Sequence, residues 1–135
     1  MNNVDYVDNY TKSANDIIEY ISTDKSIVSI LGENAFYPLF TTVTDKTTVT
    51  YNLIPSKIGI INEATLNLKV ISPADQEALR VISYLEKLLV MTDSIYKKYK
   101  SAYFYSEYSS GGRLFNPEYR MYEQSLSFNL KWRCL

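Results

Sequence analysis

The chain has 135 residues, of which 14 are basic and 15 acidic, so its formal net charge at pH 7 is −1. This length predicts one domain whose core is large enough to need no disulfide or metal. A protein that grips duplex DNA through its phosphates normally carries a basic face or arm, and no long run of one charge is present. Tight DNA binding is therefore not expected.

The sequence contains no histidine and a single cysteine, Cys134. Histidine is the commonest general base and metal ligand, and one cysteine cannot form an internal disulfide. No apolar run approaches the roughly 20 residues that cross a bilayer. We therefore expect a soluble, non-enzymatic protein with no cofactor, metal or membrane contact, able to fold in a reducing cytoplasm.

Thirteen tyrosines make the composition unusual. A tyrosine has an apolar ring and a polar tip, which suits a half-buried surface or a contact with another protein. Because the chain is also rich in Asn, Ile and Lys, a skewed codon supply explains the tyrosines equally well. Both interpretations stay open at this stage.

The first residues are polar and acidic. We expect residues 1–13 to form a flexible N-terminal arm, followed by a single domain over residues 14–135. Apolar residues recur at helical spacing after Ser13, and either Ser13 or Asn15 can cap this helix at its start.

A second helix start is indicated at Thr23 and Asp24. The short apolar helix that follows ends at Gly32, because glycine adopts the left-handed cap conformation at little cost. The pattern predicts an N-terminal helix that is broken near Ser22 and packs by one side on a sheet.

Three extended segments come next. Residues 35–38 are a short edge piece that ends in a proline, and residues 47–53, rich in Thr and Val, form a strand after a loop. The clearest strand is residues 65–71, where apolar and polar side chains alternate with a period of two. Three isoleucines between these strands are expected to cover an edge of the core: Ile58, Ile60 and Ile61.

Residues 75–91 predict an amphipathic helix that lies on the sheet. Either Ser72 or Asp75 can cap its start, and a proline at position 73 is tolerated there. Its main apolar stripe contains Ala78, Ile82, Leu85 and Leu89, and is widened by Leu79 and Leu88.

The C-terminal third predicts a hairpin. Residues 101–108 and 120–133 form its two strands, and the Gly- and Pro-containing residues 109–117 form a loop at its tip. Residues 95–99 are ambiguous between a helix end and a loop. The fold class is therefore α+β: a mainly antiparallel sheet, with an N-terminal broken helix and a central helix packed on one face, closing with a long C-terminal β-hairpin.

Catalytic patterns are absent from the sequence. Nucleophilic catalysis needs an activated side chain beside a base, and Ser83 with Lys87 shows only helical spacing on a solvated face. The acidic residues form no local metal-binding set, although carboxylates distant in sequence can meet in space. The glycines at positions 111 and 112 lack the remaining residues of a phosphate-binding loop.

Protein contacts are the remaining possibility. Arg113, Leu114 and Phe115 place two large apolar groups beside an arginine at the predicted hairpin tip, a composition typical of binding hot spots. The alternative is that Leu114 and Phe115 fold back over the core, which explains them equally well. Three tyrosines on or near the hairpin can extend such a contact surface: Tyr103, Tyr105 and Tyr119.

The order of these parts resembles the tail-terminator, or tail-completion and head–tail joining, family of tailed bacteriophages. The similarity covers nearly the whole chain from about Asp16 and rests on order and spacing more than on one sharp motif. Its parts are the broken helix ending in Leu31-Gly32, then Phe36-Tyr37-Pro38, then the strand from Thr65 to Ser72 that leads straight into the central helix, and last the hairpin strand with Leu126-Ser127-Phe128-Asn129-Leu130.

The resemblance implies a structural virion protein, assembled in the host cytoplasm, that forms a ring of usually six copies at the head-proximal end of the tail. Such a ring ends growth of the tail tube and joins the tail to the head connector or neck protein, and DNA passes through it without tight binding. A head-completion or portal-adaptor protein of the same particle is the alternative. A small-ligand binder or enzyme is the least supported reading.

Overall fold

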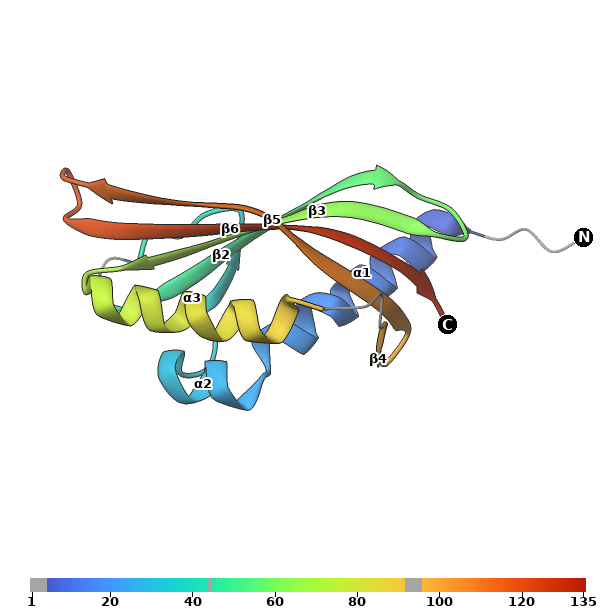
Figure 1. Ribbon diagram of the computed structural model, residues 1–135, viewed down its shortest axis with the longest axis horizontal. Coiled ribbons are helices and arrows are strands. Elements are labelled where there is room, and N and C mark those ends of the chain that lie inside the picture. The colour runs from blue at the N-terminus through green and yellow to red at the C-terminus, as the bar shows by residue number, and fades with distance from the viewer. Residues whose placement is uncertain (1–4, 44, 92–95) are drawn as a thin grey trace, which may run out of the picture.

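The computed structural model describes residues 5–43, 45–91 and 96–135. In chain order its elements are α1 (Tyr6–Ser22), α2 (Lys25–Leu31), β1 (Phe36–Pro38), β2 (Thr48–Lys57), β3 (Asn62–Ser72), α3 (Asp75–Leu89), β4 (Lys97–Tyr99), β5 (Ala102–Asn116) and β6 (Met121–Cys134). Figure 1 shows the strands as one curved layer, with the helices on one side of it. The predicted α+β class is confirmed.

The six strands form one sheet in the order β1-β2-β3-β6-β5-β4. All neighbouring pairs are antiparallel except the short β1, which runs parallel to β2. The β5–β6 hairpin is paired along its whole length, from Ala102 opposite Cys134 to Asn116 opposite Met121. The tip of this hairpin lies at one end of the long axis, and the start of α1 and the C-terminus lie at the other (Figure 1).

The core lies between the sheet and the helices. Along β3 the side chains of Leu66, Leu68 and Val70 are buried, and the residues between them are more exposed, as the period of two predicts. Burying one such side chain stabilises the fold by about 1.5–3 kcal/mol. The largest fully buried side chains come from β5 and β6: Phe104, Phe128 and Trp132.

The N-terminal helix α1 starts at Tyr6, so the prediction of a flexible arm over residues 1–13 is wrong from Tyr6 onward. Asp5 caps the helix, because its carboxylate accepts a hydrogen bond from the Asp8 backbone N–H at 3.0 Å. The buried residues of α1 lie in its later turns, from Ser13 to Ile21. Residues 1–4 lie outside the described residues.

Neither Ser13 nor Asn15 caps a helix, because both lie within α1. Ser13 is buried, and its hydroxyl donates to the Asn9 carbonyl oxygen at 2.6 Å. The same hydroxyl oxygen accepts the indole N–H of Trp132 at 2.8 Å. This serine therefore joins the helix to β6 at the centre of the core.

The predicted break between the first two helices is confirmed. Asp24 caps α2 by accepting hydrogen bonds from the backbone N–H groups of Ser26 and Ile27, at 3.0 and 3.2 Å. Gly32 ends α2 with a φ of +77°, a conformation that favours glycine.

The central helix α3 is confirmed but shorter than predicted, ending at Leu89. Its cap residue is Ala74, so the proposed caps Ser72 and Asp75 are wrong. The Ser72 hydroxyl instead accepts the Ala74 N–H at 3.0 Å and shares a buried hydrogen bond with Thr47 at 2.7 Å.

The apolar stripe of α3 is rotated slightly from the predicted one. Ala78, Leu85 and Leu89 are buried as predicted, and Val81 completes the buried stripe. Leu79, which was expected to widen this stripe, faces solvent and is 46% exposed.

Strand β2 continues past the predicted break at Pro55 and ends at Lys57. β1 pairs only with residues 49–51 of β2, so Pro55 lies at an edge of the sheet, where a proline is tolerated. The prediction that the following isoleucines cover the core is wrong for Ile58 and Ile60, whose side chains are exposed at the turn into β3.

The predicted hairpin is confirmed, but its tip lies elsewhere. Residues 109–116, predicted as a loop, belong to β5, and the turn is made by residues 117–120. An irregularity in the pairing between Tyr108 and Ser110 marks a β-bulge. In the ambiguous region, Lys97–Tyr99 form β4, and position 95 lies outside the described residues.

Candidate interaction surface

The six predicted contact residues do not form one patch. Tyr103 and Tyr105 lie near the start of β5, Leu114 lies near its end, and Tyr119 lies in the following turn. At about 3.3 Å per residue, Tyr103 and Leu114 are separated by roughly 35 Å along the strand. The structure therefore divides the predicted site into two surfaces.

Arg113 points toward the helices and is already engaged within the chain. It lies opposite Gln124 on β6, and its guanidinium forms a salt bridge with Asp75 in the first turn of α3. The Gln124 amide also donates to Asp75, at 3.3 Å. The Asp75 carboxylate also interacts favourably with the helix dipole at the N-terminus of α3. Through this salt bridge, Arg113 links the hairpin to α3.

Phe115 lies on the same face of the sheet as Arg113. Its ring contacts the ring of Tyr122 on β6, with centroids 4.8 Å apart. The sequence left open whether Phe115 is an exposed contact residue or folds back over the core. In the structure its side chain packs on its own hairpin and is still 45% exposed.

Leu114 has the opposite orientation. It lies opposite Glu123, on the face of the sheet away from the helices, which we call the open face. Its side chain is 60% exposed, as is that of Tyr119. Leu114 therefore does not fold back over the core.

Two further exposed apolar side chains, those of Leu39 and Phe40, were not singled out from the sequence. They follow β1, and their side chains are 67% and 72% exposed. The next residues, 41–43, share a hollow of about 250 Å³ with Tyr119 of the hairpin turn. We call the exposed side chains of Leu39, Phe40, Leu114 and Tyr119 the tip patch.

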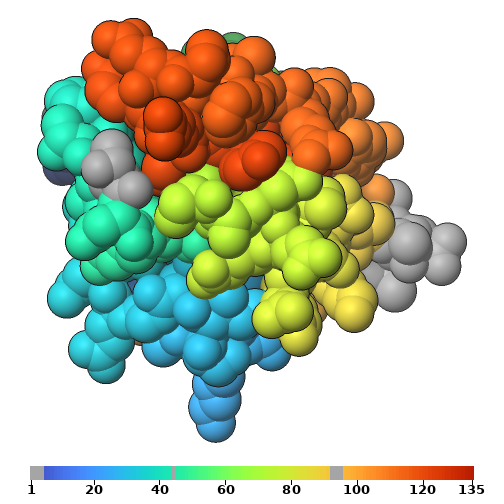
Figure 2. Space-filling view, turned by 90° about the vertical axis from the view of Figure 1, so that its left-hand side faces the viewer, coloured from blue at the N-terminus to red at the C-terminus, as the bar shows by residue number. Residues whose placement is uncertain are grey.

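Figure 2 shows this end of the molecule, with the segment that follows α2 on one side of the hairpin. The signal that could have identified the two missed residues is an apolar pair directly after the proline of a short edge strand, outside any periodic pattern. An isolated exposed apolar residue needs no explanation, but several gathered at one end point to a contact.

The tyrosines at the other end of β5 form an aromatic cluster. The rings of Tyr96 and Tyr103 stack with centroids 5.0 Å apart, and Tyr96 also contacts Tyr105 at 5.6 Å. The Tyr105 hydroxyl donates to the Met91 carbonyl oxygen at 3.4 Å. Tyr105 is therefore partly buried by contacts within its own chain.

A second exposed apolar group lies at this far end. Tyr6 and Ile60 line a hollow of about 320 Å³ together with Arg133 and Cys134. We call Tyr6 and Ile60 the end patch. The chain thus presents two different apolar surfaces, separated by the length of the sheet.

Polar contacts fix α1 to the turn between β4 and β5. The Ser101 backbone N–H donates to the Asp16 carboxylate at 3.0 Å, and its hydroxyl donates to the same oxygen. These hydrogen bonds, the hydroxyl one above all, lower the pKa of Asp16 below its usual value. An ion pair between Lys100 and Glu19, at 2.6 Å, lies beside them.

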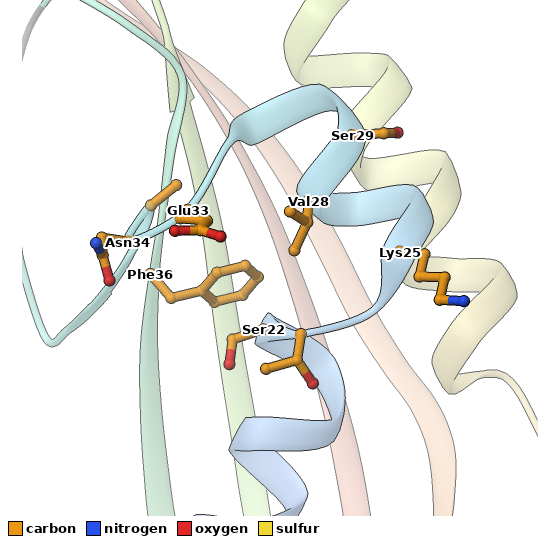
Figure 3. Close-up of a pocket in the computed structure, with 9 residues that line it drawn as sticks. Ser22, Lys25, Val28, Ser29, Glu33, Asn34 and Phe36 are labelled. Atoms are coloured by element: carbon orange, nitrogen blue, oxygen red, sulfur yellow. The ribbon is translucent and has the colours of Figure 1, made fainter.

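A hollow of about 640 Å³ lies between α1, α2 and β1 (Figure 3). Its lining contains one carboxylate, Glu33, and in the view of Figure 3 the side chain of Lys25 points away from Phe36 and Glu33. Residues of this kind do not converge on a point where a substrate could react.

Two further searches concern the described residues only. Within residues 5–43, 45–91 and 96–135, no group of three or more His, Cys, Asp or Glu side chains is placed to hold a metal ion. None of the helices in this part of the chain is long and apolar enough to span a membrane.

No protein-family model and no curated protein sequence matches the chain. A similar fold is found in a chain of the virion of a native gene transfer agent (GTA) particle, with a TM-score of 0.64 and 12% sequence identity. The superposition covers 88% of this chain and 92% of that chain. The two chains therefore share a fold over nearly their whole lengths.

Proposed function

We propose that this chain is a structural virion protein that forms a ring at the head-proximal end of a phage tail. There it ends growth of the tail tube and joins the tail to the head connector. The observation that carries this proposal is the similarity in fold, over nearly the whole of both chains, to a component of a phage-like virion. The order of helices and strands that resembles tail terminators supports the finer assignment.

The tip patch supplies both sides of the contact between neighbouring copies, with Leu114 on one side and Leu39 and Phe40 on the other. A closed ring needs two different surfaces on each subunit, because head-to-tail contacts repeat around the ring. Leu114 and Phe40 at one end of the hairpin are exposed apolar side chains of the kind that a neighbour buries. Burial on assembly removes their contact with water without any change in the fold of the subunit.

The end patch is assigned to an axial partner, the tail tube or the connector. Tyr6 and Ile60 lie at the far end of the sheet from the tip patch, so both surfaces can be occupied at once. DNA passes through the ring without tight binding, which fits a subunit whose net charge is −1.

Electron microscopy of labelled protein tests this proposal. The purified chain is mixed separately with tail tubes and with tail-less heads of the virus that encodes it. Rings at one end of the tubes are expected. Rings found only on tail-less heads assign the chain to head completion or to a portal adaptor, and a chain that forms no ring alone or on either structure contradicts the proposal.

A further inference from the structure

The outer edge of β5 is bare along most of its length. Strand β4 pairs only with residues 102–104 of β5, so among the described residues the part of β5 from 105 to 116 has a neighbouring strand on the β6 side alone. Residues 107–115 are all exposed. Such an edge presents a row of backbone N–H and C=O groups that can pair with another chain.

The opposite edge of the sheet is protected in a way that this one is not. Beyond β1, the free part of β2 contains Pro55 and an irregular pairing before Lys57, and both features discourage strand addition. On β5 the bulge at Tyr108 leaves a regular stretch, residues 110–116, which contains no proline. This stretch is therefore the part of the sheet that is most open to an added strand.

The same molecule carries a segment suited to become that strand. Residues 39–43 read Leu-Phe-Thr-Thr-Val, a composition that favours strands, but they form no strand in the single chain. Leu39 has a φ of +69°, which a residue other than glycine rarely adopts, and the chain turns sharply there. Phe40 is then held outward with most of its ring exposed.

The two parts lie at the same end of the molecule, where Leu39 lines a hollow with Ser110 and Gly111 of β5 in the single chain. Figure 2 shows the segment after α2 on one side of this end, with the hairpin turn above. A head-to-tail row of copies can bring residues 39–43 of one copy beside the β5 edge of the next. Rotation that closes the row gives each copy one donated and one received strand.

We propose that residues 110–116 of β5 receive residues 39–43 of the next copy as an added strand in the assembled ring. The inference rests on the proposed ring and names the contact that builds it. Main-chain hydrogen bonds supply the affinity, as in other cases of strand addition. Apolar side chains on the open face determine which segment binds. Leu114 of one copy then lies beside Leu39 or Phe40 of the other.

Cysteine cross-linking tests the contact in assembled protein. Cys134→Ser provides a background without thiols, into which Thr42→Cys and Leu114→Cys are placed in separate chains. A disulfide needs Cα atoms about 4.4–6.8 Å apart, so Ser110→Cys is tested as a second register. Mixed chains are expected to cross-link between one Thr42→Cys copy and one β5 variant, with neither variant cross-linking alone.

Ile54→Cys on the protected β2 edge is the matched control, because this side chain is also exposed. Rings that form normally but cross-link no more through β5 than through Ile54→Cys overturn the inference and leave the proposed ring intact. Absence of any ring, alone or on tail tubes, overturns both.

Hydrogen exchange gives a second readout that needs no variant. The backbone amides of residues 110–116 are expected to exchange at least about tenfold more slowly in rings than in single chains, because half of them gain partners. Residues 52–57 on the β2 edge serve as the internal reference. Equal exchange at the β5 edge before and after assembly contradicts strand addition.

Discussion

Replacing Leu114 with serine separates assembly from folding. The side chain lies on the open face of β5 near the hairpin tip and is 60% exposed in the single chain. Because it contributes little to the core, we expect Leu114→Ser to change the free energy of unfolding by no more than about 0.5 kcal/mol. Its effect on ring formation should be much larger.

The size of that effect follows from the exposed part of the side chain. Full burial of a leucine is worth about 1.5–3 kcal/mol. With 60% of the side chain left to bury, each ring contact gains about 1–2 kcal/mol from Leu114. The association constant of each contact should therefore fall by about 5–30-fold in Leu114→Ser.

Sedimentation velocity over a range of protein concentrations measures this change. Leu79→Ser is the matched control, since Leu79 is also an exposed leucine but lies on the outer side of α3, away from the tip patch. Thermal unfolding of both variants reports on the single chain. Equal weakening of assembly by the two variants would refute the assignment of the tip patch to ring contacts.

Three predictions concern the fold. Trp132→Phe removes the indole N–H donated to Ser13 and leaves a small void, so denaturant unfolding should show a loss of about 1–3 kcal/mol. The lowered pKa of Asp16 means that its contribution to stability is present above about pH 4, its unfolded value, and is lost as pH falls through the folded value. Unfolding measured from pH 7 to pH 3 should therefore depend less on pH in Asp16→Asn. A Cβ added at Gly111 would lie 2.9 Å from a tyrosine hydroxyl oxygen and 3.1 Å from a carbonyl oxygen of β6, so Gly111→Ala should cost about 1–3 kcal/mol.

Each of these predictions has a control or a result that would contradict it. Gly112→Ala should cost less than Gly111→Ala, because the nearest atom is the flexible hydroxyl of Ser125 at 3.2 Å. Unfolding of Asp16→Asn with the same pH dependence as the original chain would contradict the role given to its carboxylate. Trp132→Phe with unchanged stability would show that the hydrogen bond to α1 adds nothing to the fold.

Much of the fold could be predicted from local patterns. The alternation along β3 and the apolar stripe of α3 are periodic because each element packs one face on the core. The cap at Asp24 and the stop at Gly32 are likewise local chemistry. Such features depend on neighbours in sequence and can be recognised there.

The hairpin tip could not be placed in this way. Gly111 and Gly112 were interpreted as a loop, whereas they lie within β5, where the Tyr108 hydroxyl and a β6 carbonyl approach Gly111 closely. A glycine inside a strand often marks such an approach, which is set by a partner strand far along the chain. The turn itself is made by residues 117–120, around a proline that was placed at the end of the loop.

The six predicted contact residues differ in exposure and in their partners within the chain. Leu114 and Tyr119 are exposed at the tip as the hot-spot interpretation required, but Arg113 is paired with Asp75, 38 residues away. Phe40 lies in a segment without periodicity, so the periodic patterns that located the helices and strands could not identify it. Exposure and long-range pairing are properties of the folded chain and are not encoded in local spacing.

Cryo-electron microscopy of the intact virion tests the central claim most directly. The account predicts a closed ring of copies of this fold between the end of the tail tube and the head connector, with the hairpin tips at the contacts between neighbouring copies. A junction that contains no density for this chain, or single copies that do not touch one another, would contradict it.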